Sequence, residues 1–134
     1  MKKVLIALVV LVFVGAGIAY YMYNKPVESL EHQKADVAIS ADQLIQDYES
    51  DENKANEKYL GKVVEVSGKV AGITQEEGKH KVSLETSNPI SAIICELEEH
   101  LKTEDLKVGD QAKMKGKCSG YLNDVILVQS SIVK

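Results

Sequence analysis

The spacing of apolar residues along the chain predicts three kinds of element in turn. Residues 4–23 contain no charge and are almost entirely apolar. At about 1.5 Å per residue, a helix of this length spans roughly 30 Å, the thickness of the hydrocarbon core of a bilayer. The first pattern therefore predicts a transmembrane helix over residues 4–23.

The charges beside this helix indicate its orientation. Lys2 and Lys3 precede it, whereas only Lys25 follows closely before the acidic Glu28 and Glu31. Basic residues at the ends of membrane helices favour the cytoplasmic side. We therefore expect residues 1–3 to be cytoplasmic and the rest of a single-pass chain to lie outside the cytoplasmic membrane, in a periplasm or at a cell surface.

A cleaved signal peptide is the competing interpretation of the same segment. Gly17 and Ala19 place small residues at the two positions that a signal peptidase recognises. The apolar run is longer than the roughly 7 to 15 residues of a usual signal peptide, which favours an uncleaved anchor. Either interpretation exports the remaining domain.

A polar segment and then a helical period follow the apolar run. Residues 24–39 are polar, contain Pro26 near their start and show little periodicity, so they predict a tether. Ser40 and Gln43 have the spacing of a helix-capping pair. Apolar residues then recur at helical spacing over residues 41–59, with an acidic outer face, which predicts one amphipathic helix.

After Gly61 the apolar period falls to two, the period of a β-strand. Five such runs follow, and residues 98–110 form a short helical or irregular connection between the third and the fourth. Five short strands with internal glycines predict a mainly β fold, a small closed barrel of the OB type. An open antiparallel sheet with the helix packed on one face is the alternative. The five runs are residues 62–73, 80–86, 91–98, 111–122 and 124–133.

Two stretches give the chain a resemblance to a known family. "ISADQLIQDYESDENKANEKYLGKVVEVSGKV" and "GKCSGYLNDVILVQSSIV" resemble the tRNA_anti-like family of exported bacterial OB-fold proteins, with coverage from about Ile39 to Lys134. The resemblance implies an OB-fold domain over residues 40–134. It implies no ligand, because the family's name refers to anticodon-binding domains of the same fold, and one fold hosts unrelated functions. The matching positions are Ala55, Asn56, Tyr59, Leu60, Gly61, Val63, Val66, Gly68, Val70, Gly116, Cys118, Gly120, Tyr121, Asp124 and Val125.

A stripe of lysines is the most conspicuous charged feature of the predicted strands. Lys113, Lys115 and Lys117 alternate with apolar residues and should share the outer face of the barrel. Binding of single-stranded nucleic acid requires such charges together with aromatic platforms, and four of the chain's seven aromatic residues lie in residues 4–23. The formal charge of residues 4–134 is −6, which opposes nucleic-acid binding. We therefore expect a solvated face on which lysines prevent aggregation.

The two cysteines fall on the inward phase of their strands. Cys95 and Cys118 can form a disulfide in an exported domain if their Cα atoms come within about 7 Å. The alternative is two separate buried thiols that pack as small apolar residues. The chain has no C-x-x-C pair, which disfavours redox catalysis.

The sequence offers no grouping that suits a metal, a cofactor or catalysis. His32, His80 and His100 are isolated from one another, and the acidic residues 47–52 lack the glycine and terminal glutamate of a calcium loop. Phosphate-binding and dinucleotide-binding motifs are absent from the sequence. We therefore expect a protein that is not an enzyme and that uses no cofactor.

The turn at residues 119–124 is the most plausible ligand contact, because many OB proteins bind through the loop between their last two strands. We expect the chain to be an extracytoplasmic binding module for an envelope protein, peptide or glycan. The alternatives are a nucleic-acid-binding protein and a redox accessory protein that uses Cys95 and Cys118. The candidate ligand-binding residues are Tyr121, Asn123 and Asp124, together with Lys113, Lys115 and Lys117.

Overall fold

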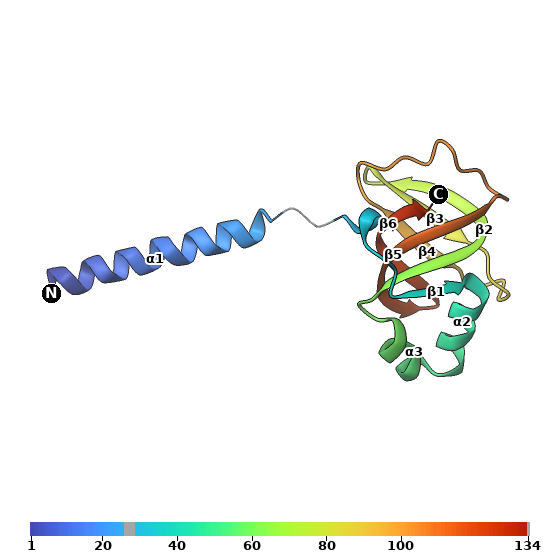
Figure 1. Ribbon diagram of the computed structural model, residues 1–134, viewed down its shortest axis with the longest axis horizontal. Coiled ribbons are helices and arrows are strands. Elements are labelled where there is room, and N and C mark those ends of the chain that lie inside the picture. Colours follow the sequence, from blue (N-terminus) through green and yellow to red (C-terminus); the bar gives the residue numbers. More distant parts are fainter. Residues whose placement is uncertain (26–28, 134) are drawn as a thin grey trace.

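A computed structural model describes residues 1–25 and 29–133, which form one long helix and a β-barrel domain (Figure 1). Residues 26–28, which belong to the predicted tether, and Lys134 lie outside the described residues. Helix α1 (Lys2–Tyr23) has no buried residue and is long and apolar enough to cross a membrane. Because a signal sequence also lies near the N-terminus, the helix fits both expectations for this segment.

Five strands form a closed barrel in the order β2-β3-β4-β6-β5, with β5 returning to pair with β2. The β4–β6 pair is parallel and the other four pairs are antiparallel. This topology confirms the predicted mainly β, five-stranded OB-type barrel and excludes the open sheet. The strands are β2 (Val63–Glu76), β3 (Lys79–Leu84), β4 (Ile93–Leu97), β5 (Gln111–Leu122) and β6 (Asp124–Val133).

The inward positions are those that the alternation predicts. Val66, Val82 and Cys95 are among the fully buried residues of a single core cluster. Gly116 is inward on β5, where a Cβ atom would collide with the Ser130 hydroxyl. The absence of a side chain at this position therefore lets β5 and β6 approach closely.

The helical region before the barrel is two helices, not the single helix predicted over residues 41–59. Helix α2 (Ala41–Ser50) ends at Asp51, and α3 (Glu52–Tyr59) begins immediately after it. Asp51 is extended, with φ −159°, and its carboxylate accepts a hydrogen bond from the Lys54 amide. An aspartate at this position caps the second helix, which offsets the loss of helical hydrogen bonds at the break.

Part of the segment predicted as a tether, residues 24–39, packs on the barrel. The chain makes a short 3-10 turn, η1 (Leu30–His32), and then strand β1 (Val37–Ser40), which pairs in parallel with the first half of β2. Leu30 is 5% exposed. Residues 29–36, which we call the strap, therefore lie against the barrel.

One buried lysine fastens the strap. The Lys115 Nζ atom donates to the carbonyl oxygens of Glu31 and Gln33, at 2.8 and 2.7 Å. The Glu98 carboxylate accepts from the Leu30 amide at 3.1 Å, and the Asp36 carboxylate accepts from the Val63 amide at 2.9 Å. The strap is therefore held to the barrel by hydrogen bonds to charged side chains or from them, near each end and at its middle.

The expectation of a solvated lysine stripe is therefore wrong at its central member. Lys113 and Lys117 are exposed, whereas Lys115 is 9% exposed. Strand alternation places all three side chains outside the barrel, but it carries no information about the strap that covers one of them.

Lys115→Met should destabilise the domain by about 2–3 kcal/mol, because two carbonyl groups lose a charged donor. Lys113→Met, which changes an exposed residue on the same face, should alter the free energy of unfolding by less than about 0.5 kcal/mol. Urea unfolding of both variants measures the difference. Equal effects would show that the strap contributes nothing to stability through Lys115.

Candidate functional site

The predicted ligand corner is largely occupied by structural contacts. Asn123 forms the turn between β5 and β6, with a φ of +70°. The Asp124 carboxylate accepts a hydrogen bond from the Ala92 amide at 2.7 Å, which ties this turn to the loop before β4. The Tyr121 ring stacks on Tyr48, with ring centroids 5.3 Å apart. Asn123 is therefore the one exposed member of this predicted trio, and Tyr121 and Asp124 are half-buried.

The three tyrosines of the domain join the helices to the barrel. Tyr48 contacts Tyr121 on one side and Tyr59 on the other, and its hydroxyl lies 3.3 Å from the Cys118 Sγ atom. Burial raises the pKa of both Tyr48 and Tyr59 well above the usual range, so both hydroxyls stay neutral. Residues 29–133 contain no other aromatic side chain, so the described surface has no row of platforms on which bases could stack.

Cys95 and Cys118 are buried free thiols. Each pairs in register with Leu127, from opposite sides of β6. Their Cα atoms are therefore about two strand spacings, or roughly 9 Å, apart. This exceeds the reach of a disulfide, about 7 Å. Burial also raises the pKa of the Cys95 thiol to about 12, which suppresses the thiolate that redox chemistry needs.

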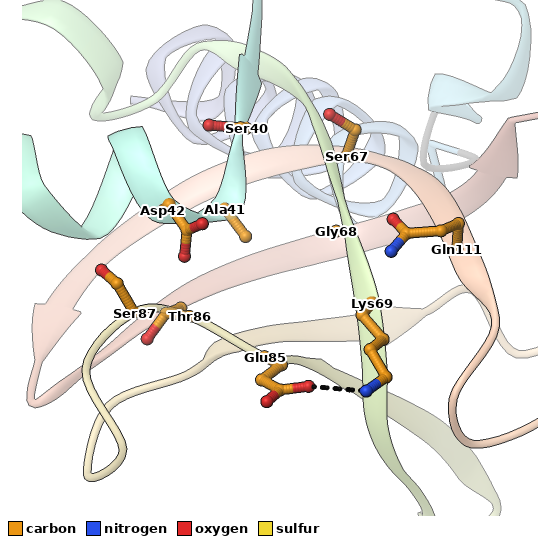
Figure 2. A pocket seen from close by; sticks show the side chains of 10 residues that line it. All are labelled: Ser40, Ala41, Asp42, Ser67, Gly68, Lys69, Glu85, Thr86, Ser87 and Gln111. Atoms are coloured by element: carbon orange, nitrogen blue, oxygen red, sulfur yellow. Dashed lines mark ion pairs between the residues drawn. The ribbon is translucent and has the colours of Figure 1, made fainter.

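The main concave feature of the barrel surface is a pair of adjoining hollows of about 400 and 850 Å³. They share Lys69, Glu85, Thr86 and Ser87, and we call them together the β2 groove. Figure 2 shows the smaller hollow, between the start of α2 and the strand that carries Lys69. The groove residues are Ser40, Ala41, Asp42, Ser67, Gly68, Lys69, Val70, Ala71, Glu85, Thr86, Ser87, Asn88, Pro89, Ile90, Ser91, Ala92, Val108, Gly109, Gln111 and Asp124.

The groove exists because β2 changes neighbours within it. Strand β3 leaves β2 after Leu84, and β1 pairs with the same edge of β2 only as far as Ser67. Gly68 lies in the interval, where an added Cβ would be 3.0 Å from that of Ala41. A glycine at this point lets the start of α2 pack directly on the strand.

The far wall of the groove, residues 85–92, is fixed by its own hydrogen bonds. The Thr86 hydroxyl lies within hydrogen-bond distance of the carbonyls of Asn88 and Ser91, at 2.9 and 2.6 Å. The Asn88 side-chain amide donates to the Glu49 carboxylate of α2. This wall is therefore held on both sides, and its position does not depend on a ligand.

The groove lining mixes polar and apolar groups and is net acidic, because it contains Lys69 and three carboxylates, those of Asp42, Glu85 and Asp124. The Lys69 ammonium lies 3.5 Å from the Glu85 carboxylate, and both side chains are about half exposed (Figure 2). Ile90 and Val108 are 84% and 64% exposed, which is unusual for large apolar side chains. Such a surface suits a ligand with hydrogen-bonding groups and apolar side groups, and its excess of carboxylates disfavours an anionic ligand.

No predicted ligand residue except Asp124 lines the groove, and the described residues contain no cluster of three metal-ligating side chains. Alternation along single strands could not locate the groove, because it forms where strands end. The signals for it were the glycine at position 68 and the turn-rich run "ETSNPISA".

Comparison with known proteins supports the fold. The family model described as tRNA_anti-like matches residues 1–132. None of the curated proteins searched matches this chain.

Solved structures give more distant similarities. A lipoprotein of Klebsiella pneumoniae subsp. pneumoniae MGH 78578, provisionally described as nucleic acid-binding, has 21% identity and a TM-score of 0.61, over 71% of this chain and 91% of its own. The S. pombe Stn1-ten1 complex has 15% identity and a TM-score of 0.42, over 54% of this chain and 58% of the matched chain. Entamoeba histolytica asparaginyl-tRNA synthetase has 13% identity and a TM-score of 0.41, over 55% of this chain and 21% of its own. At these identities the similarity shows the fold alone, and the last two carry no further argument.

Tyr59→Phe should destabilise the domain at neutral pH. The Tyr59 hydroxyl donates to the Asp47 carboxylate at 2.5 Å and is the main cause of the lowered pKa of Asp47. A carboxyl whose pKa is lower in the folded state adds stability above its unfolded pKa of about 3.9, and this stability is lost as pH falls through the folded pKa. The deficit of the variant, measured by urea unfolding, should therefore shrink as the pH is lowered from 7 toward 3. A deficit that stays constant would contradict this linkage.

Neither cysteine of the folded protein should react with a thiol reagent such as dithionitrobenzoate at pH 8. Both should react after unfolding in guanidinium chloride, with no prior reduction, because the thiols are free and inaccessible in the fold. Absorbance counts the released thiolate. A protein that needs a reductant before its thiols appear would contradict the structure.

Proposed function

Because this chain belongs to the tRNA_anti-like family, we propose that it is a non-catalytic OB-fold binding module. Helix α1 holds it at the outer side of a cytoplasmic membrane, and it takes its ligand in the β2 groove. The ligand is an extended chain molecule of low charge.

Three features support the membrane location. Helix α1 is long enough and apolar enough to span a bilayer, and Lys2 and Lys3 favour a cytoplasmic N-terminus. Tyr20, Tyr21 and Tyr23 lie at the other end of the helix, where interfacial aromatic residues are common.

The observation that carries the proposed binding role is the β2 groove itself. Its two hollows adjoin, its far wall is hydrogen-bonded in place, and it exposes Ile90 and Val108 beside polar side chains. A preformed concavity with apolar groups and a few fixed polar groups is the usual form of a binding site. Because it contains no activated nucleophile or acid–base pair, binding is the function that it supports best.

Nucleic-acid binding is the second candidate, and the description of the Klebsiella lipoprotein is the reason to retain it. The charges of this chain oppose it. Lys81 lies 2.8 Å from the Glu76 carboxylate and 3.6 Å from that of Glu96, and Lys115 is covered by the strap. A track for a phosphate backbone needs cations that are free to face it.

A photoreactive amino acid placed at position 90 or 108 of the full chain, expressed in a bacterial membrane, should cross-link a bound ligand. The same group at position 117, which is exposed on β5 and outside the groove, is the matched control. Mass spectrometry of the adducts identifies the ligand. Adducts at position 117 alone would place the binding surface elsewhere.

Nucleic acid should not bind detectably to the full chain in detergent micelles. A fluorescent 20-nucleotide single strand at low salt, followed by anisotropy, measures this directly. Tight binding that Lys113→Glu and Lys117→Glu abolish would replace the proposed function with the second candidate.

A further inference from the structure

We propose that the ligand of the β2 groove is a polypeptide segment, which binds in extended form by adding a strand to the free edge of β2 at Ile73 and Gln75. This inference rests on the proposed function, because it names the ligand class of the same groove.

The edge is free because β5 begins too late to cover it. Strand β5 pairs with β2 from Val63 only as far as Lys69. Beyond that point, Val70 exchanges hydrogen bonds with two successive residues, donating to Asp110 and accepting from Gly109. Gly109 has a φ of +96°, and this glycine bulge turns the chain away from β2.

The second half of β2 pairs with β3 alone. The turn between them has two residues, Glu77 and Gly78, both with positive φ, so the pair that closes it, Glu76 with Lys79, is hydrogen-bonded. In an antiparallel pair, bonded and non-bonded positions alternate.

The backbone groups of Gln75 and Ile73 therefore point away from β3. Gln75 pairs with His80, one position beyond the closing pair, and Ile73 pairs with Val82, two positions further along the strand. Their N–H and C=O groups have no protein partner among the described residues. These four groups form a short unpaired edge.

The connection over residues 98–110 makes no backbone hydrogen bond to Ile73 or Gln75 among the described residues. Its Leu101 and Leu106 pack against the core, and its Thr103 hydroxyl lies 3.5 Å from the ring of His80. His80 shares the inward phase with Val82, so this contact lies over the mouth of the barrel and not along the edge. Thr74 and Gln75 are exposed.

The free edge begins beside one end of the β2 groove, at Ala71 and Val108. The bulge between Val70 and Gly72 places Ala71 at the point where the groove ends and the free edge begins. Val108, beside the departing turn, is 64% exposed. An added strand on the edge would direct alternate side chains toward Ala71 and Val108, which gives the groove a role in selecting apolar side chains.

The composition of the edge also favours pairing. Residues 71–75, "AGITQ", carry neither a charge nor a proline. Proteins that protect an edge strand from added chains place lysine, proline or another charge on it. This part of β2 lacks such protection.

Only a polypeptide backbone matches this edge. Donor and acceptor occur together on Ile73 and again two residues later on Gln75, a repeat of about 7 Å. A peptide strand offers the complementary pair at the same repeat, whereas a phosphate backbone offers acceptors alone. The excess of carboxylates in the groove also disfavours a phosphate backbone.

Hydrogen exchange followed by NMR tests the edge without any ligand. The amides of Ile73 and Gln75 should exchange at least tenfold faster than those of Gly72, Thr74 and Glu76, which are bonded to β3. Equal protection at all five positions would mean that the edge is already paired, and the inference would fail.

Peptides selected from a random heptapeptide display library on the full chain in detergent micelles test the ligand class. A synthesised binder should lose at least tenfold in affinity when alternate amides are N-methylated, and its binding should protect the Ile73 and Gln75 amides from exchange. Gln75→Pro, which removes an edge donor, should reduce affinity at least tenfold, whereas Gln75→Ala should not. An unchanged thermal melting curve verifies that the proline variant is folded.

The outcomes separate this inference from the proposed function. Peptides that bind but tolerate N-methylation and Gln75→Pro, and that cross-link to position 90, would overturn strand addition and leave the groove as the site. Recovery of no peptide, with a non-peptide ligand cross-linked to position 90, would overturn the polypeptide class. Failure of all groove cross-links would overturn the proposed function as well. Dimerisation of the chain that Gln75→Pro abolishes, without peptide binding, would assign the edge to a second copy and overturn the inference.

Discussion

The barrel depends on one strand that must serve two neighbours. Strand β2 has 14 residues, pairs with β5 along its first half and with β3 along its second, and so closes the sheet on itself. A strand in this position has to coil, and its glycines and the irregularity after Val70 allow it to do so. Closure removes most of the sheet's exposed edges, but short parts of β2 stay unpaired where one partner strand ends. On one edge of β2 there is a gap between β1 and β3, and on the other edge the pairing with β5 ends near Val70.

The candidate site follows from these gaps. On one edge, the interval between β3 and β1 is the floor of the β2 groove, and on the other edge the early departure of the chain at Gly109 leaves backbone groups without partners. The start of α2 and the loop over residues 85–92 turn the first gap into a walled depression. The candidate site of this chain therefore arises from the geometry of barrel closure.

The sequence predicts the features that depend only on the order of residues within one strand, such as which side chains face the interior. Alternation placed Val82, Leu84 and Cys95 inside correctly, because a period of two requires no knowledge of the partner strand. The break at Asp51 was missed, since the apolar stripe continues through it and the capping aspartate looks like part of an acidic face. The burial of Lys115, the groove and the free edge all depend on segments distant in the sequence, and register between such segments is not encoded in periodicity.

The strap sets how far the module can work from a bilayer. If α1 spans a membrane, five residue steps separate Asn24 at its end from Ser29, where contacts with the barrel begin. Fully extended, they reach about 18 Å. A domain on so short a connection encounters molecules in the membrane or at its surface at a high effective concentration, and distant ones hardly at all. In such an anchored chain, the fastening by Lys115 would limit the volume that the groove can reach.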